Sequence, residues 1–326
     1  MKIRKVLLSV LLVGGVAALL IILDYMPKPA NTFFWRTLFD GGHAPLFGVM
    51  SVLVLFLSTL VIRGQNAVRL WHYAAAFGIP TFIGIVVEVL QINSRRDADP
   101  WDAVTNMIGS LAFLIYFATI DTNWPDRLGK IISRFKLSLR LIALLLMAIP
   151  LVPPLLWAVA TLQRNSEFPV LLTFEKGWEE KYLEATYATI QYVEPPSEWV
   201  NNQSEQAGLI FFDTTKWGYP SLALREPFPD WRGYDSLAFV LYSPHKQNKK
   251  VYIRVNDRRH NEAYSDRYNE SLTVRPGENR FAIPISRIES APAGRSMNLG
   301  LIRELKLFID SKNAPFELYV DDIELR

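Results

Sequence analysis

Residues 88–109 read EVLQINSRRDADPWDAVTNMIG, and the rest of the chain is organised around this stretch. An apolar segment of membrane-spanning length lies on each side of it. The stretch itself is rich in charged and amide side chains, including Glu88, Gln91, Asp102 and Asn106. Ionisable groups near a hydrocarbon layer are costly and need partners, so this cluster predicts a functional site.

The composition limits the classes of function. The 326 residues are enough for two domains, with long apolar runs in the first half and short alternations from about Phe168 onward. A net charge of +3 without a basic block gives no indication of nucleic-acid binding. No Gly-rich phosphate loop follows a strand, so no nucleotide site is expected. The chain has no cysteine, which excludes disulfides and thiol catalysis.

Five apolar segments approach the ~20 residues needed to cross a bilayer. They are residues 6–23, 44–62, 70–91, 103–120 and 141–160. The first follows a basic N-terminus and precedes no small-residue cleavage site, so we expect an uncleaved span rather than a signal peptide. In the last segment, Pro150, Pro153 and Pro154 are expected to kink or break the helix.

Basic residues predict the orientation. Five spans place the N-terminus, the loop with Arg63 and Arg69, and the basic loop after residue 120 on one side, which should be the cytoplasm. We therefore predict a multi-pass protein of the cell (inner) membrane with a cytoplasmic N-terminus and an extracytoplasmic C-terminal domain. This topology gathers the polar ends of spans two to four at the outer level. The predicted membrane pocket consists of Asp40, His43, Glu88, Gln91, Arg95, Arg96, Asp102 and Asn106.

Residue spacing supports this pocket. Glu88 and Gln91 are three residues apart and so share one helical face, as do Asp102 and Asn106, four apart. The glycines at positions 41, 42 and 109 would let the helix backbones approach closely.

His43 followed by Phe47, E-x-x-Q at residues 88–91, an arginine-rich turn, and D-x-x-x-N-x-x-G at residues 102–109 together resemble the VanZ-like membrane family. The resemblance covers about residues 24–120, four of the five predicted spans. It implies a small polytopic envelope protein related to one associated with glycopeptide-antibiotic resistance. The turn departs from the family pattern because Asp97 and Asp99 make it more acidic.

Several roles for this pocket stay open. The charges can form a network that locks a helical hairpin, since buried charges need partners whatever their purpose. Alternatively, Arg95, Arg96 and His43 contact the phosphate of an anionic or sugar-bearing lipid headgroup. In a hydrolytic or transfer site, Glu88 or Asp102 would be the general base and His43 would assist. A metal centre for a hard cation, formed by His43, Asp40, Glu88 and Asp102, is a further alternative.

After a linker at residues 163–169, the apolar period changes to two. Eight segments read as strands: 170–174, 208–213, 236–243, 250–256, 270–275, 279–284, 304–309 and 317–325. Such a succession of short antiparallel strands predicts an all-β jelly-roll sandwich over residues 170–326. The predicted fold class is therefore two-domain, with a polytopic α-helical membrane domain of five spans at residues 1–162 followed by the sandwich.

Several segments of this half resemble the galactose-binding-like sandwiches of carbohydrate-binding modules. They are TFEKG at 173–177, WRGYDSLAF at 231–239, VYIRVND at 251–257, the turn at 298–302 and LYVDDIEL at 318–325. In that family an acid of the first strand and an aspartate of the last often bind a structural calcium ion. The resemblance carries this role to Glu175 and Asp322, with Asp321 as a neighbour. The alternative is a pair of solvated acids at adjacent strand ends.

Sugar binding requires aromatic faces for stacking and planar polar side chains that fix hydroxyl groups. The predicted glycan-binding residues are Trp217, Tyr219, Arg225, Asp257, His260 and Tyr264. Trp231, Phe239, Tyr252 and Phe308 alternate with polar neighbours and are predicted to be core residues. The polar run at 256–267 reads equally well as a solvated loop.

These features favour an accessory, non-catalytic envelope protein that recognises a glycan or a lipid-linked cell-envelope precursor at the outer face. Its expected partners are a saccharide and the lipid bilayer, and a structural calcium ion in the sandwich is a candidate cofactor. The resemblances suggest a link to glycopeptide resistance or envelope biogenesis. Two other classes stay open: a membrane hydrolase or transferase acting on a lipid-linked glycan, and a scaffold whose sandwich binds protein.

Overall fold

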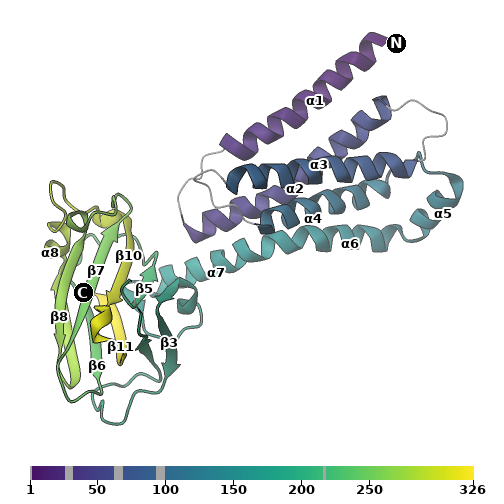
Figure 1. Ribbon diagram of the computed structural model, residues 1–326. Helices are drawn as coiled ribbons and strands as arrows, with labels where there is room; N and C mark the ends of the chain where they lie inside the picture. The colour runs from purple at the N-terminus through teal and green to yellow at the C-terminus, as the bar shows by residue number, and fades with distance from the viewer. Residues whose placement is uncertain (1, 26–31, 62–68, 93–99, 216–217) are drawn as a thin grey trace. The chain divides into compact units, whose positions relative to one another are not determined.

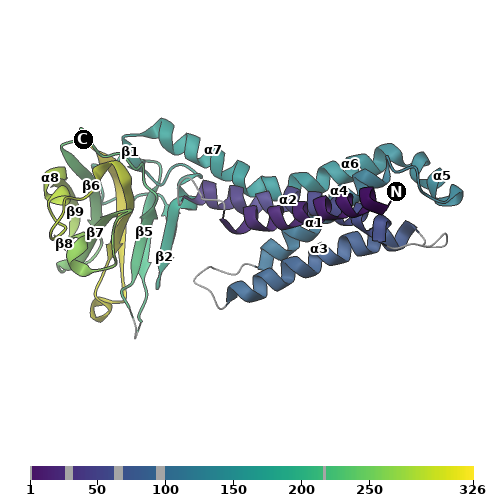
Figure 2. The ribbon, with the colours of Figure 1, turned by 90° about the horizontal axis from the view of Figure 1, so that it is seen from above.

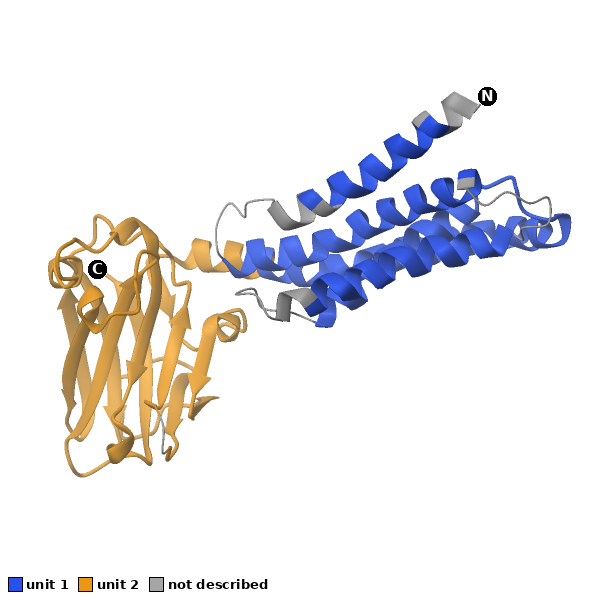
Figure 3. Cartoon of the chain, turned by 45° about the horizontal axis from the view of Figure 1, so that its top comes forward, with its two compact units in different colours: residues 1–158 blue, residues 159–326 orange. Residues whose placement is uncertain are grey.

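A computed structural model describes residues 2–25, 32–61, 69–92, 100–215 and 218–326. The chain divides into two compact units, residues 1–158 and 159–326 (Figure 3). The boundary falls inside helix α7 (Val152–Glu167), so residues 163–167 of the predicted linker are helical.

The first unit is a bundle of helices (Figures 1 and 2). Its helices before α7 are α1 (Lys2–Tyr25), α2 (Phe33–Val61), α3 (Arg69–Ile92), α4 (Pro100–Ala118), α5 (Asp126–Arg134) and α6 (Lys136–Ala148). A 3₁₀ turn at Ile149–Leu151 interrupts the path from α6 to α7, which confirms the predicted effect of the prolines there.

Within the described residues, four segments are long and apolar enough to cross a membrane. They are Phe33–Leu60, Arg69–Val89, Pro100–Ala118 and Lys136–Glu167. The prediction of a fifth span is not confirmed. The segment predicted at 6–23 lies in α1, and its described apolar part, Leu8–Leu19, is shorter than the ~20 residues that a span needs.

Helix α2 begins at Phe33 rather than near residue 44, so Asp40 and His43 lie inside the helix. The helix continues through the glycines and through Pro45. A Cβ atom at Gly41 would lie 2.6 Å from the carbonyl oxygen of Pro150, and one at Gly109 would lie 2.5 Å from the Cα of Ala44. The predicted close approach is therefore confirmed at positions 41 and 109, whereas no atom would lie within 4 Å at position 42.

The second unit is an antiparallel β-sandwich, as predicted. Its first sheet has six strands in the order β3-β4-β11-β6-β9, with β1 paired to β11, and its second sheet has five strands in the order β2-β5-β10-β7-β8. The strands are β1 (Val170–Leu172), β2 (Leu183–Thr186), β3 (Ala188–Val193), β4 (Ala207–Phe212), β5 (Ser221–Arg225), β6 (Ser236–Ser243), β7 (Lys249–Asp257), β8 (Tyr268–Val274), β9 (Gly277–Pro284), β10 (Ile302–Phe308) and β11 (Phe316–Leu325). The sequence did not predict β2, β3 and β5.

The sandwich core consists of side chains from the inner faces of both sheets. Phe174, Phe212 and Trp231 are among its largest fully buried members. Trp231 and Phe239 were predicted core residues, and both are buried. Burial of side chains of this size stabilises a fold by roughly 1.5–3 kcal/mol each, so the core holds the two sheets together and fixes which face of each strand points outward.

Candidate functional site

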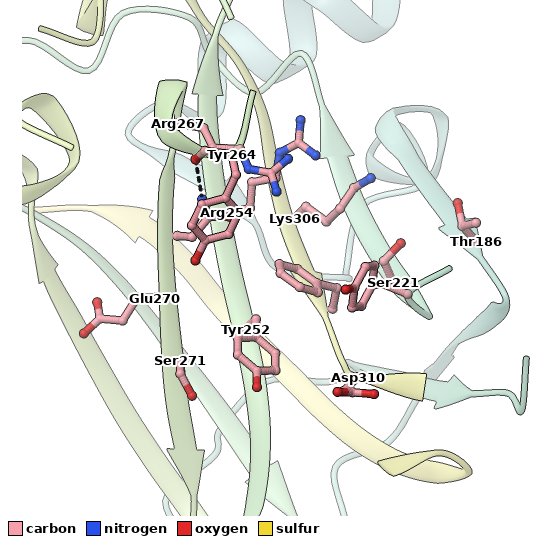
Figure 4. A pocket seen from close by; sticks show the side chains of 13 residues that line it. Thr186, Ser221, Tyr252, Arg254, Tyr264, Arg267, Glu270, Ser271, Lys306 and Asp310 are labelled. Atoms are coloured by element: carbon pink, nitrogen blue, oxygen red, sulfur yellow. Dashed lines mark hydrogen bonds between the residues drawn. The ribbon is translucent and has the colours of Figure 1, made fainter. Parts of the chain in front are cut away.

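The outward face of the second sheet carries a groove of about 600 Å³ (Figure 4). Alternation along the strands sets this face. Val251, Ile253 and Val255 of β7 are buried in the core, so the side chains of Tyr252 and Arg254 point to the opposite side. The same parity holds in β10, where Leu305 and Leu307 are buried while residues 306 and 308 line the groove.

Strand register arranges the lining side chains in rows across the sheet. The first, which we call the aromatic row, is Ser271, Tyr252, Phe308, Ser221 and Thr186, each opposite the next. Two residues along, about 7 Å away, Asn269, Arg254 and Lys306 face one another in the same way. The groove is thus aromatic and hydroxyl-bearing in one row and basic in the next.

The aromatic side chains contact one another. The rings of Tyr252 and Phe308 stack with centroids 5.2 Å apart, and Tyr219 meets Phe308 edge-on at 5.7 Å. Tyr219 is 62% exposed and Tyr264 is 72% exposed, and both line the groove. Exposed tyrosines combine an apolar ring with a hydrogen-bonding hydroxyl, the combination suited to a ligand with apolar and polar faces.

The structure assigns different places to the predicted glycan-binding residues. Tyr219 and Tyr264 lie in the groove, whereas Trp217 lies outside the described residues. Arg225 does not line the groove, because its guanidinium pairs with Glu304 and, at 2.9 Å, with Glu184.

Asp257 and His260 belong to a buried polar cluster instead of the groove. The carboxylate of Asp257 accepts two hydrogen bonds from Arg295, at 2.7 and 2.9 Å, and one from the backbone N–H of Asn298 at 2.7 Å. Burial alone raises the pKa of Asp257, but the bonds from Arg295 and the backbone outweigh it and hold the pKa below its usual range. His260 contacts the backbone oxygen of Asp266 through Nδ1 at 2.9 Å. This cluster fixes the loop after β7.

The assignment of Tyr252 and Phe308 to the core is wrong, because both line the groove. Their position in the sequence carried the necessary signal. Tyr252 has the parity of Arg254, and Phe308 has the parity of Lys306. An aromatic side chain that shares a strand face with a basic residue faces outward when the alternate positions are aliphatic.

The residues proposed for calcium lie near each other, but they do not form a larger acidic group. Oε1 of Glu175 accepts a hydrogen bond from the backbone N–H of Glu205 at 2.9 Å. Burial and then neighbouring carboxylates, Glu175 among them, raise the pKa of Asp322. Of the three acids considered for calcium, Asp321 is the fully buried one, and burial raises its pKa to about 6. Among the described residues no group of three or more histidine and acidic side chains could hold a metal, so calcium remains a prediction.

In the helical unit, α3 and α4 bring Glu88 and Asp102 to one level. A Cβ atom at Gly84 would lie 2.8 Å from Nδ2 of Asn106, which sets the register of the two helices. The two helices are antiparallel. Glu88 lies one turn after Gly84 and Asp102 lies one turn before Asn106, so Glu88 and Asp102 are at the same level. Glu88 is 8% exposed and Asn106 is 2% exposed.

Helix α2 adds two more predicted residues at this end of the bundle. Gly109 opposes Ala44 and the ring of Phe113 opposes Gly48, with the same residue offset in both pairs, so α2 and α4 run parallel. That register places Asp40 and His43 within one helical turn of the level of Asn106.

Five of the eight predicted pocket residues thus share one end of the bundle. The side chains of Gln91, Arg95 and Arg96 fall outside the part of the chain that the structure describes.

Comparisons with known proteins concern the fold. No family model matches the sequence, and no curated protein matches it. A family 11 carbohydrate-binding module from Clostridium thermocellum, in complex with a β-1,3-1,4-mixed-linked tetrasaccharide, is similar at 16% identity over 48% of this chain and 93% of that chain, with a TM-score of 0.37. An exo-β-agarase is similar at 15% identity over 48% of this chain and 24% of its own, with a TM-score of 0.39. A family 30 carbohydrate-binding module of a Clostridium thermocellum cellulosomal cellulase is similar at 14% identity over 44% of this chain and 86% of that chain, with a TM-score of 0.33. At these TM-scores, below 0.5, the likeness carries no argument about the ligand.

Proposed function

We propose that the β-sandwich binds a glycan in the groove on its second sheet. The observation that carries the proposal is the aromatic row with its stacked Tyr252 and Phe308, flanked by the exposed rings of Tyr219 and Tyr264. The apolar face of a sugar ring packs well on aromatic side chains, while hydroxyl and amide groups such as those of Ser271 and Asn269 exchange hydrogen bonds with sugar hydroxyls. A concave site with aromatic walls and a few convergent polar groups is the usual form of a small-ligand site.

We further propose that the helical unit anchors this sandwich in a membrane as part of a VanZ-like protein, with the sandwich on the extracytoplasmic side. The four long apolar helices support the anchoring role. The buried Glu88 and Asn106 support a polar site inside the bundle, because such groups are costly in an apolar environment and are retained where they serve a purpose. In this proposal the site binds the headgroup of a lipid-linked saccharide, and the two units recognise related envelope glycans.

A glycan array tests the groove. Full-length protein in detergent is applied to immobilised oligosaccharides and compared with Tyr252→Ala. Removal of this ring takes away both its own contact with the sugar and its stack with Phe308, so we expect binding at least about tenfold weaker.

The matched control is Val200→Ala. Val200 is 83% exposed and lines a separate hollow beside the first sheet, so its truncation should leave glycan binding unchanged. Thermal unfolding of both variants confirms that they are folded. An array on which the wild-type protein retains no glycan, or on which Val200→Ala is the damaging change, contradicts the proposal.

A further inference from the structure

Three basic side chains lie together in one part of the groove, and we call them the basic patch. Arg254 of β7 stands directly opposite Lys306 of β10. Arg267, the residue before β8, lines the groove beside them. Figure 4 shows their nitrogen atoms gathered at one end of the groove, with Tyr252, Ser271 and Asp310 towards the other.

Two carboxylates, Glu304 and Glu262, compensate only part of the charge of this patch, and both do so at long distance. Arg254 is 3.7 Å from Glu304 and 3.8 Å from the exposed Glu262, and Lys306 is 3.9 Å from Glu304, all longer than a charge-assisted hydrogen bond. The close partner of Glu304 is Arg225, which lies outside the groove.

Arg267 has the fewest compensating contacts. Among the described residues it makes no ion pair, and its buried Nε has no hydrogen-bond partner. Its guanidinium lies 5.3 Å from the centre of the Tyr264 ring. Burial, followed by the charge of Arg254, lowers the pKa of Arg267, and the charges of Glu262 and Glu304 offset only part of this effect, so Arg254 and Arg267 repel each other in the free groove.

The acidic residues that line the groove are occupied elsewhere. Glu270 accepts hydrogen bonds from the hydroxyl of Tyr268 and, at 3.0 Å, from Arg287. Asp310 accepts a hydrogen bond from the backbone N–H of Lys312 at 3.0 Å. Among the described residues neither acid forms an ion pair with the basic patch, so the groove is basic at that end.

We infer that the ligand is an acidic glycan, with sugar rings on the aromatic row and a carboxylate, sulfate or phosphate group on the basic patch. This inference rests on the proposed function, because it names the class of glycan that the same groove takes. Guanidinium groups present planar forks of N–H donors that match such oxyanions in pairs, and Lys306 adds a third positive charge. A bound anion would also relieve the repulsion between Arg254 and Arg267.

The experiment uses the full-length protein and oligosaccharides in matched pairs. Members of a pair share one backbone and differ only in their acidic groups. One pair is a cello-oligosaccharide and a β-1,4-linked glucuronic acid oligomer of the same length, which carries a carboxylate at C6 of each sugar, and further pairs have sulfated or phosphorylated members. We expect the acidic member to bind at least about tenfold more tightly, with an advantage that shrinks as salt rises. Polyglutamate serves as a non-sugar polyanion and should not compete.

Variants separate the charge of the patch from the charge of the whole protein. Arg267→Gln and Arg254→Gln should each weaken binding of the acidic member about tenfold or more and leave the neutral member nearly unchanged. The control Arg275→Gln removes one exposed charge at the β8–β9 turn and should have no effect. Within the part of the chain that the structure describes, only the backbone of this residue is hydrogen-bonded.

The possible results distinguish this inference from the proposed function. Equal binding of acidic and neutral members that depends on Tyr252 would overturn the acidic ligand and keep the glycan groove. Competition by polyglutamate, or equal losses with Arg275→Gln, would show general polyanion attraction and also overturn it. Absence of binding to every sugar would contradict both.

Discussion

The close contact between α2 and α4 at Gly109 can be tested by a single substitution. This contact aligns the polar residues at one end of the helical unit. A Cβ atom added at Gly109 would meet the backbone of Ala44, 2.5 Å from its carbonyl carbon, whereas ordinary contact begins near 3.4 Å. Backbone cannot swing aside as a side chain does, so the two helices must move apart by about 1 Å. A gap of that size forfeits a quarter to a half of the dispersion energy of the atoms concerned, and overpacking of this kind costs about 1–3 kcal/mol. We expect Gly109→Ala to cost about 3 kcal/mol of unfolding free energy.

Gly42→Ala is the matched control, because it adds the same methyl group at a position with no atom within 4 Å. Alanine is favoured over glycine inside a helix, so this variant should be as stable as the wild type or more stable by up to about 1 kcal/mol. Thermal unfolding of full-length protein in detergent, followed by tryptophan fluorescence, measures both. Equal melting temperatures for Gly109→Ala and the wild type would refute the close α2–α4 packing and the register drawn from it.

Three further predictions concern buried acids. Asp257→Asn should lower the unfolding free energy of the sandwich by about 2 kcal/mol, since it removes the buried charge of an ion pair while Arg295 keeps its second partner, Asp266, and an unchanged denaturation midpoint would contradict this. Burial raises the folded-state pKa of Asp321 to about 6, above its ordinary value, so the folded state binds the proton more tightly than the unfolded state. The unfolding free energy should therefore fall by up to about 3 kcal/mol as pH rises from about 4 to 6. Asp321→Asn should flatten that slope in a pH series of unfolding curves, and a slope that persists would show another group to be responsible. Glu88→Gln should leave glycan binding by the sandwich unchanged, and loss of binding at normal protein levels would instead couple the two units.

The sequence predicted the broad architecture because its two periodicities are physically distinct. Long apolar runs identified the helices, and alternation from residue 170 identified eight strands. The strands β2, β3 and β5 were missed because they are short or lie at 183–193, where small, polar and aromatic residues follow each other without clear turn signals. The early start of α2 was missed because the predicted span was bounded by its apolar run, which Arg36, Asp40 and His43 precede.

The candidate groove was only partly predictable. Exposed Tyr219 and Tyr264 were found because they lie in polar segments with turn residues. Tyr252 was missed because an aromatic ring was assigned to the core by its type, although Arg254 on its own face and the aliphatic alternate positions mark that face as the outward one. The burial of Asp257 was not visible either, since its partner Arg295 lies 38 residues away in the sequence and nothing local marks the pair.

The most direct test of the glycan groove is hydroxyl-radical footprinting of the full-length protein with and without the glycan that binds best on the array. Tyr219 and Tyr264 are exposed in the free groove, so a ligand on the aromatic row should protect both rings, while Val200 keeps its reactivity. Unchanged reactivity of both tyrosines at saturating glycan, or protection confined to the hollow around Val200, would contradict the account.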